Sequence, residues 1–132
     1  MADKVEFELV SPERLLVSKP VDMVVVPGAE GDFGVLRGHS PLISTLRLGV
    51  IDIHDGGSVQ QRIFVAGGFA EVTAERCTVL AEEAVALSDI KRADVEGQIK
   101  GFRDRLAVAD TDAERTALAA RIAVAEAKLA LV

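Results

Sequence analysis

Residue types that could act as base and nucleophile stand side by side at His39-Ser40. An acyl-transfer site needs both groups and an orienting acid within hydrogen-bond reach, whereas neighbours in sequence rarely point at one another. A Gly-x-Ser-x-Gly motif, which would place a serine on a sharp turn, is absent. We therefore predict no catalytic residue. A small hydrolase built on these two residues stays as an alternative, which substitution of His39 would test.

Metal-ligating residue types are too scattered for a metal site. The chain has two histidines and one cysteine, and they lack the spacing that zinc and iron ligands share. A lone Cys77 cannot form an intrachain disulfide either. The sequence therefore predicts no metal and a reducing compartment.

The segment GAEGDFG, residues 28–34, contains three glycines spaced three apart. Phosphate-binding loops share this feature, but Glu30 and Asp32 would repel phosphate and no helical pattern follows. The glycines favour a tight turn. We predict an exposed acidic loop that meets a partner.

A third candidate is Asp89-x-x-Arg92-Ala93. In the first interpretation Ser88 or Asp89 is the N-cap of a helix and Arg92 is solvated. In the second, Arg92 and a base such as Arg121 hold the phosphates of a nucleotide between two helices. Spacing alone favours the first and leaves the second open.

Proline, glycine and alanine divide the chain into two parts. All four prolines lie at or before Pro41, whereas the last 44 residues include eleven alanines. Proline and glycine mark turns and alanine favours helix. We predict an all-β domain over residues 1–87 and an α-helical domain over residues 88–132.

The first part shows the alternation typical of strands. Val5, Phe7 and Leu9 alternate with charged residues, and residues 55–57, Asp-Gly-Gly, predict a hairpin turn. Nine or ten short strands without helical crossovers favour a sandwich or barrel and argue against a parallel sheet.

The second part shows two apolar stripes at helical spacing and, between them, a capping box formed by Thr111 and Glu114. A short connection predicts an antiparallel helical hairpin. Gly97 and Gly101 are expected to allow close backbone approach. The small residues along the stripes predict a small buried interface, or seam, between the two helices, and therefore a hairpin that detaches. The stripes comprise Val95, Ile99, Phe102 and Leu106, then Leu118, Ile122, Ala125 and Leu129.

Charge and hydropathy exclude two classes of partner. The formal net charge is −6, and the chain has neither Trp nor Tyr for stacking bases, so nucleic acid is not expected. No apolar run exceeds four residues, which excludes a helical membrane span. The start Met-Ala-Asp-Lys lacks a secretory signal pattern, so we expect a cytoplasmic location.

Taken in order, several motifs resemble one family, the epsilon subunit of bacterial F-type ATP synthase. The motifs are VEFELVSPE, GAEGDFGVLRGHSPLI, LGVIDI, FVAGGFAEV and CTVLAEEA, followed by the helical pattern. The resemblance implies a flattened ten-stranded sandwich with a C-terminal helical hairpin. It also implies a subunit without chemistry of its own, which turns with the gamma subunit and the c-ring and couples proton flow to ATP synthesis at the alpha and beta subunits.

The resemblance further implies a place for several residues. Glu30, Asp32, Phe33 and His39 would face the c-ring at the cytoplasmic face of the bacterial inner membrane, with peripheral membrane association through that ring only. The hairpin would restrain ATP hydrolysis. No cofactor would be required.

For a regulatory ATP, Asp89, Arg92 and Ala93 match part of the family's nucleotide motif, and Ser88 stands where that motif has Ile or Leu. Arg121 completes the candidate site. A free-standing β-sandwich module that binds a small ligand is the alternative from another functional class.

Overall fold

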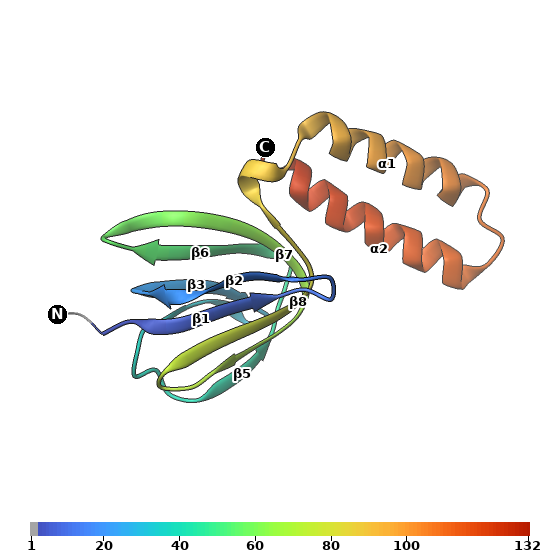
Figure 1. Ribbon diagram of the computed structural model, residues 1–132. Coiled ribbons are helices and arrows are strands. Elements are labelled where there is room, and N and C mark those ends of the chain that lie inside the picture. The colour runs from blue at the N-terminus through green and yellow to red at the C-terminus, as the bar shows by residue number, and fades with distance from the viewer. Residues whose placement is uncertain (1–2) are drawn as a thin grey trace. The chain divides into compact units, whose positions relative to one another are not determined.

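The computed structural model describes residues 3–132, which divide into two compact units with the boundary between Ala86 and Leu87. The first unit is made of strands and the second of helices (Figure 1). Both parts predicted from proline, glycine and alanine are present.

Eight strands form the first unit within the described residues. They are β1 (Val5–Val10), β2 (Leu15–Val21), β3 (Met23–Gly28), β4 (Gly31–Val35), β5 (Leu42–Thr45), β6 (Gly49–Asp55), β7 (Ser58–Val72) and β8 (Arg76–Ala86). The hairpin turn predicted at residues 55–57 joins β6 to β7.

The two longest strands, β7 and β8, belong to both layers of a sandwich (Figure 1). One layer follows the order β2-β1-β8-β7-β5 and uses residues 76–80 of β8 and 69–72 of β7. The other layer follows the order β8-β7-β6-β3-β4 and contains the remaining parts of β7 and β8. Each layer therefore has five strand segments, which explains why a chain expected to have ten strands has eight continuous ones.

A pair of glycines lets β7 pass from one layer to the other. Gly67 and Gly68 have φ of +71° and +103°, which side chains disfavour, and the β7–β8 register runs through them unchanged. A Cβ on Gly68 would lie 1.9 Å from the carbonyl oxygen of Leu80. The strand therefore bends at these glycines and does not end there.

The alternating residues of the first part form the core between the layers. Val5, Phe7 and Leu9 are fully buried, as predicted, and pack with the inner-facing residues of β3, β6, β7 and β8. Within the described residues the strand pairs are antiparallel, as expected without helical crossovers, with the exception of β1 and β8, which pair in parallel.

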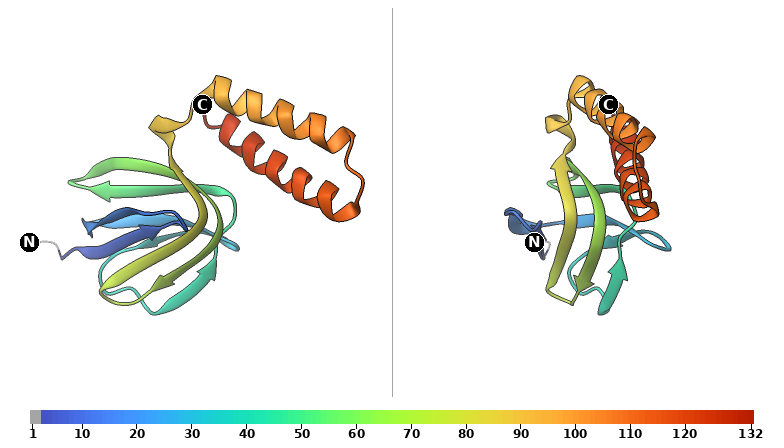
Figure 2. Two further views of the ribbon diagram at one scale, coloured as in Figure 1. Left: turned by 45° about the vertical axis from the view of Figure 1, so that its right-hand side comes forward. Right: turned by 90° about the vertical axis from the view of Figure 1, so that its right-hand side faces the viewer.

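The second unit is an antiparallel hairpin of α1 (Arg92–Ala107) and α2 (Asp112–Leu129) (Figure 2). The Thr111 hydroxyl accepts a hydrogen bond from the Glu114 amide at 3.1 Å, which confirms the threonine half of the predicted capping box. The cap predicted at Ser88 or Asp89 is wrong. Those residues lie in a short 3₁₀ helix, Leu87–Asp89, and Lys91 precedes α1 without a side-chain cap.

The predicted stripes meet along the hairpin seam. Val95 and Ile99 of α1 and Leu118, Ile122 and Ala125 of α2 are buried, and the other stripe residues are half-buried. The two glycines of α1 do not have the predicted role. A Cβ at residue 97 or 101 would meet no atom within 4 Å, so these positions face open space.

Candidate functional site: an open hollow between two strand edges

The acidic loop predicted at residues 28–34 is the tight turn from β3 to β4. Gly28 pairs with Gly31 across the turn, and the Ala29 amide donates to the Thr45 carbonyl at 2.9 Å. That bond brings the end of β5 beside the turn. As a result, β4 and β5 are neighbours although neither pairs with the other: within residues 3–132, β4 pairs only with β3 and β5 only with β7.

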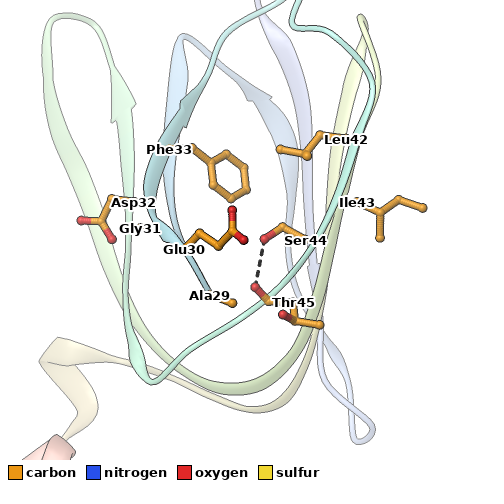
Figure 3. Close-up of a pocket in the computed structure, with 9 residues that line it drawn as sticks. All are labelled: Ala29, Glu30, Gly31, Asp32, Phe33, Leu42, Ile43, Ser44 and Thr45. Atoms are coloured by element: carbon orange, nitrogen blue, oxygen red, sulfur yellow. Dashed lines mark hydrogen bonds between the residues drawn. The ribbon is translucent and has the colours of Figure 1, made fainter.

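Between these two edges lies an open hollow (Figure 3). Because side chains alternate along a strand, Phe33, Leu42 and Ser44 face the inner side, whereas Asp32 and Ile43 point away from it. The Glu30 side chain also points into the hollow from the turn. We call this feature the β4–β5 hollow; it is lined by Ala29, Glu30, Gly31, Asp32, Phe33, Leu42, Ile43, Ser44 and Thr45.

Asp32 and Glu30 have different electrostatic surroundings. Arg47 pairs with the Asp32 carboxylate through one guanidinium nitrogen and donates to the Gly28 carbonyl at 2.6 Å through another. Glu30 makes no ion pair with any residue of the described chain. Sequence reasoning missed Arg47, because an arginine fifteen positions after an aspartate has no local signal.

The Phe33 ring is positioned by the backbone of the turn. It is half-buried and packs against the sandwich core. A Cβ on Gly28 would lie 2.8 Å from Phe33 Cε1, so the ring occupies the space that any larger residue at position 28 would need. This glycine therefore fixes where an aromatic face can lie in the hollow.

His39, the other residue predicted in this region, does not line the hollow. It follows the far end of β4, in a loop whose Gly38 amide donates to the Ala74 carbonyl at 2.6 Å. The ring nitrogen Nδ1 lies 2.6 Å from the Ser40 carbonyl oxygen and donates to it. That contact directs the imidazole to the backbone of Ser40 and not to its hydroxyl, which speaks against the hydrolase alternative.

A second exposed feature crosses four strands of one layer. Val10 pairs with Leu15 and with Leu80, and Leu80 pairs with Phe69. The side chains of Leu15, Phe69 and Leu80 are 55 %, 41 % and 40 % exposed. We call Leu15, Val10, Leu80 and Phe69 the apolar row. A shallow hollow lies along it, bounded on one side by Glu82. Sequence patterns did not predict the row because it depends on register between strands distant in the chain.

The helical hairpin contains the residues predicted to bind a nucleotide. Arg92 lines a groove on one side of the seam, together with Lys100 and Arg103. Each of these bases lies near a carboxylate, with nitrogen–oxygen distances of 3.6 Å to Glu96, 3.0 Å to Asp104 and 3.9 Å to Glu126. A phosphate would have to compete with these carboxylates.

The structure does not bring all four predicted nucleotide residues together. At 100° per residue, Arg121 lies on the opposite side of the buried α2 stripe from Glu126, and therefore away from Arg92. Asp89 and Ala93 are exposed and do not line the groove. The Arg92 guanidinium donates to the Val132 carbonyl at 2.5 Å, which links the two ends of the hairpin.

The remaining chemistry-bearing residue is Cys77, on β8. Burial in the core raises the pKa of its thiol to about 12. No set of three or more His, Cys, Asp and Glu side chains converges for a metal within residues 3–132. In that same part of the chain, neither helix is long and apolar enough to cross a membrane.

Known proteins match this chain in sequence and in fold. Residues 4–87 match the family model for the ATP synthase Delta/Epsilon chain beta-sandwich domain. The ATP synthase epsilon chain of Rhodospirillum rubrum is 57 % identical over 130 residues, 98 % of this chain and 97 % of that one. The Rhodospirillum centenum epsilon chain is also 57 % identical, over 100 % of this chain and 94 % of its own length.

A solved structure shares the fold. A chain in the cryo-EM structure of the Euglena gracilis mitochondrial ATP synthase matches 98 % of this chain and 82 % of its own length, with a TM-score of 0.78 and 23 % identity. Given the family model and the full-length relatives, this protein belongs to the ATP synthase epsilon chain family.

Proposed function

We propose that this chain is a non-catalytic subunit of the rotor of a proton-translocating ATP synthase. In this role it joins the gamma subunit to the c-ring and helps to couple proton flow to ATP synthesis at the alpha and beta subunits. The observation that supports it most is the 57 % identity to ATP synthase epsilon chains along nearly the whole sequence. Through the c-ring it would lie at the cytoplasmic face of the inner membrane.

Two surfaces of the sandwich suit two partners. The β4–β5 hollow, with the unpaired Glu30 and the protruding Ile43, is the proposed c-ring contact; Asp32, Phe33 and His39 are the other residues predicted to face the ring. The apolar row is the proposed gamma contact, because adjacent exposed apolar side chains on a soluble domain mark protein interfaces.

For the hairpin we propose a regulatory, mobile element that restrains ATP hydrolysis. Its support is the small contact between the two helices: in the part of the chain that the structure describes, Val95, Ile99 and Ala125 form its buried cluster, with Ile90 and Leu129 packed against them. A regulatory ATP held by Asp89, Arg92, Ala93 and Arg121 is a separate proposal. It requires the basic side chains of the groove to break their ion pairs with the neighbouring carboxylates. It also requires Arg92 and Arg121 to contact the nucleotide from opposite sides of the interface between the two helices.

The test is reconstitution. Membranes depleted of this chain should regain ATP-driven proton pumping when the purified chain is added, and the tagged chain should co-purify with gamma and the c-ring. Ile43→Asp should reduce this recovery, because it places a charge on a side chain that is 70 % exposed at the hollow. Val59→Asp, at an exposed apolar side chain outside both surfaces, is the matched control. Unchanged coupling after depletion would contradict the proposal.

A further inference from the structure

We infer that the bend of β7 at Gly67 and Gly68 is a hinge between the two layers of the sandwich, and that Arg47 is the positioning residue that braces this hinge. The inference goes beyond the proposed function, because it concerns how the chain keeps two of its surfaces at a fixed angle. These surfaces meet at the bend: Thr45, which lines the β4–β5 hollow, pairs with Phe69 of the apolar row.

Three segments of chain pass from one layer to the other side by side. β5 and β6 pair with β7 in one continuous register, because Thr45 lies opposite Phe69 and Gly49 lies opposite Val65. Residues 46–48 therefore lie opposite residues 66–68, and we call these two segments the corner. On its other side β7 pairs with β8 without a change of register. A change in the angle between the layers has to bend the chain at the corner.

The backbone of the corner combines a flexible segment with a segment that changes its partner. Gly67 and Gly68 have φ of +71° and +103°, and glycine can absorb changes of dihedral angle at low cost. Opposite them, the Leu46 amide donates to the Gly68 carbonyl at 3.0 Å, whereas the next amide, of Arg47, donates to the Pro27 carbonyl of β3 at 3.1 Å. Residues 46 and 47 thus connect the bend in β7 to the second layer.

The Arg47 side chain strengthens this connection. One guanidinium nitrogen donates to the Gly28 carbonyl at 2.6 Å, and another pairs with the Asp32 carboxylate, so the side chain holds both strands that flank the turn between β3 and β4. The backbone approaches closely here as well, since a Cβ on Gly49 would lie 2.7 Å from Pro27 Cβ. A guanidinium suits this position because its planar donors can bind two acceptors at once.

The brace spans the hinge at a place where the sheet itself is open. Within residues 3–132, β4 pairs only with β3 and β5 only with β7, so no ladder joins β4 to β5. The Ala29 amide, which donates to the Thr45 carbonyl at 2.9 Å, and the contacts of Arg47 link these two edges. Without Arg47 the backbone bonds of the corner would open more often, because local opening depends on the contacts that hold a segment.

The experiment measures amide hydrogen exchange of the free full-length chain. Arg47→Met keeps the aliphatic stem and removes both polar contacts. We expect the amides of Ala29, Leu46 and residue 47 to exchange about tenfold faster, as for loss of one or two hydrogen bonds. Amides in the middle of β6 and β8 should change by less than about twofold, because their ladders stay intact.

Arg62→Met is the matched control. Its side chain is 53 % exposed, against 44 % for Arg47, and its ion pair with Asp52 at 2.9 Å lies within one layer. It should change exchange at the corner by less than about twofold. The inference is overturned if Arg47→Met exchanges like the parent chain, if it accelerates exchange equally throughout the sandwich, or if Arg62→Met has the same effect at the corner.

A second measurement tests the consequence for the rotor and rests on the proposed function. In membranes depleted of this chain, saturating Arg47→Met should restore less ATP-driven proton pumping than saturating Arg62→Met, because the angle between the two surfaces is less well fixed. Equal restoration by the two variants would overturn a role of the brace in coupling, while the proposed function stands. Failure of the parent chain to restore pumping would contradict the proposed function itself, whereas the exchange measurement on the free chain would keep its meaning.

Discussion

Phe69 lies directly opposite Leu80 across the β7–β8 ladder, and both side chains point away from the core with 41 % and 40 % of their surface exposed. The buried Ala70 and Val79 are paired at the next position, so the exposure of Phe69 and Leu80 follows from the alternation of the strands. Such a pair gains free energy when a partner covers it.

We predict that Phe69→Asp weakens association with the gamma subunit about 30-fold, as loss of a central apolar anchor does in other interfaces. The free chain should keep its thermal stability, because the side chain is already partly in water. Binding to purified gamma subunit, measured beside the melting temperature, checks both parts. Val59→Asp on the same strand should leave gamma binding unchanged. Equal loss in both variants would show a nonspecific effect of charge.

A second prediction concerns the bend in β7. Gly68→Ala should destabilise the sandwich by roughly 2–3 kcal/mol, because its Cβ would lie 1.9 Å from the Leu80 carbonyl oxygen and its φ is +103°. Urea unfolding of the full chain, followed through the β signal, measures the change. A near-neutral Gly68→Ala would mean that β7 and β8 separate easily at the bend.

The sequence predicted elements whose signals are local. Val5, Phe7 and Leu9 were assigned to one strand face by their alternation, and the Thr111 cap followed from its own neighbours. By contrast, the continuity of β7 through Gly67 and Gly68 depends on pairing with β8. A pair of glycines permits either the end of a strand or a bend within a continuous strand, so the local sequence could not distinguish the two.

The candidate site was predictable only in part, for the same reason. The turn and its two acids are local features of residues 28–34. Which acid faces the hollow depends on the alternation of β4, and which one is neutralised depends on Arg47, a residue beyond β5. The apolar row likewise needs the register of β1, β7 and β8 together, including the parallel pair that sequence reasoning did not expect.

A third prediction uses the open space beside α1. Gly97→Ala should stabilise the hairpin by about 1 kcal/mol, because alanine has the higher helix propensity and its Cβ meets no neighbour. Slower hydrogen exchange of the α1 amides would report the gain. Gly56→Ala is an instructive control, since its Cβ also has open space but its φ is +65°. That variant should lose about 1 kcal/mol from the sandwich. A loss at position 97 would indicate a contact on the outer face of α1.

The last prediction follows from Cys77. Burial raises the pKa of its thiol from 9.0 to about 12, so between these values the unfolded chain loses a proton that the folded chain keeps. Stability from this group is therefore present below pH 9 and is lost as the pH rises toward 12, by about 1.4 kcal/mol per pH unit. Lysines also titrate in this range, so the comparison must be with Cys77→Ala, which retains them.

Cys77→Ala should be less stable than the parent chain at neutral pH, because it leaves a small cavity beside the core residues Phe7 and Val72 that pair with position 77. As the pH rises from about 8 to 10.5, the parent chain alone loses the thiol contribution, and the difference in free energy of unfolding should shrink. Urea titrations of both proteins across this range measure it. A constant difference would mean that the thiol ionises as readily in the folded chain as in the unfolded one, and that water reaches the space between the two layers.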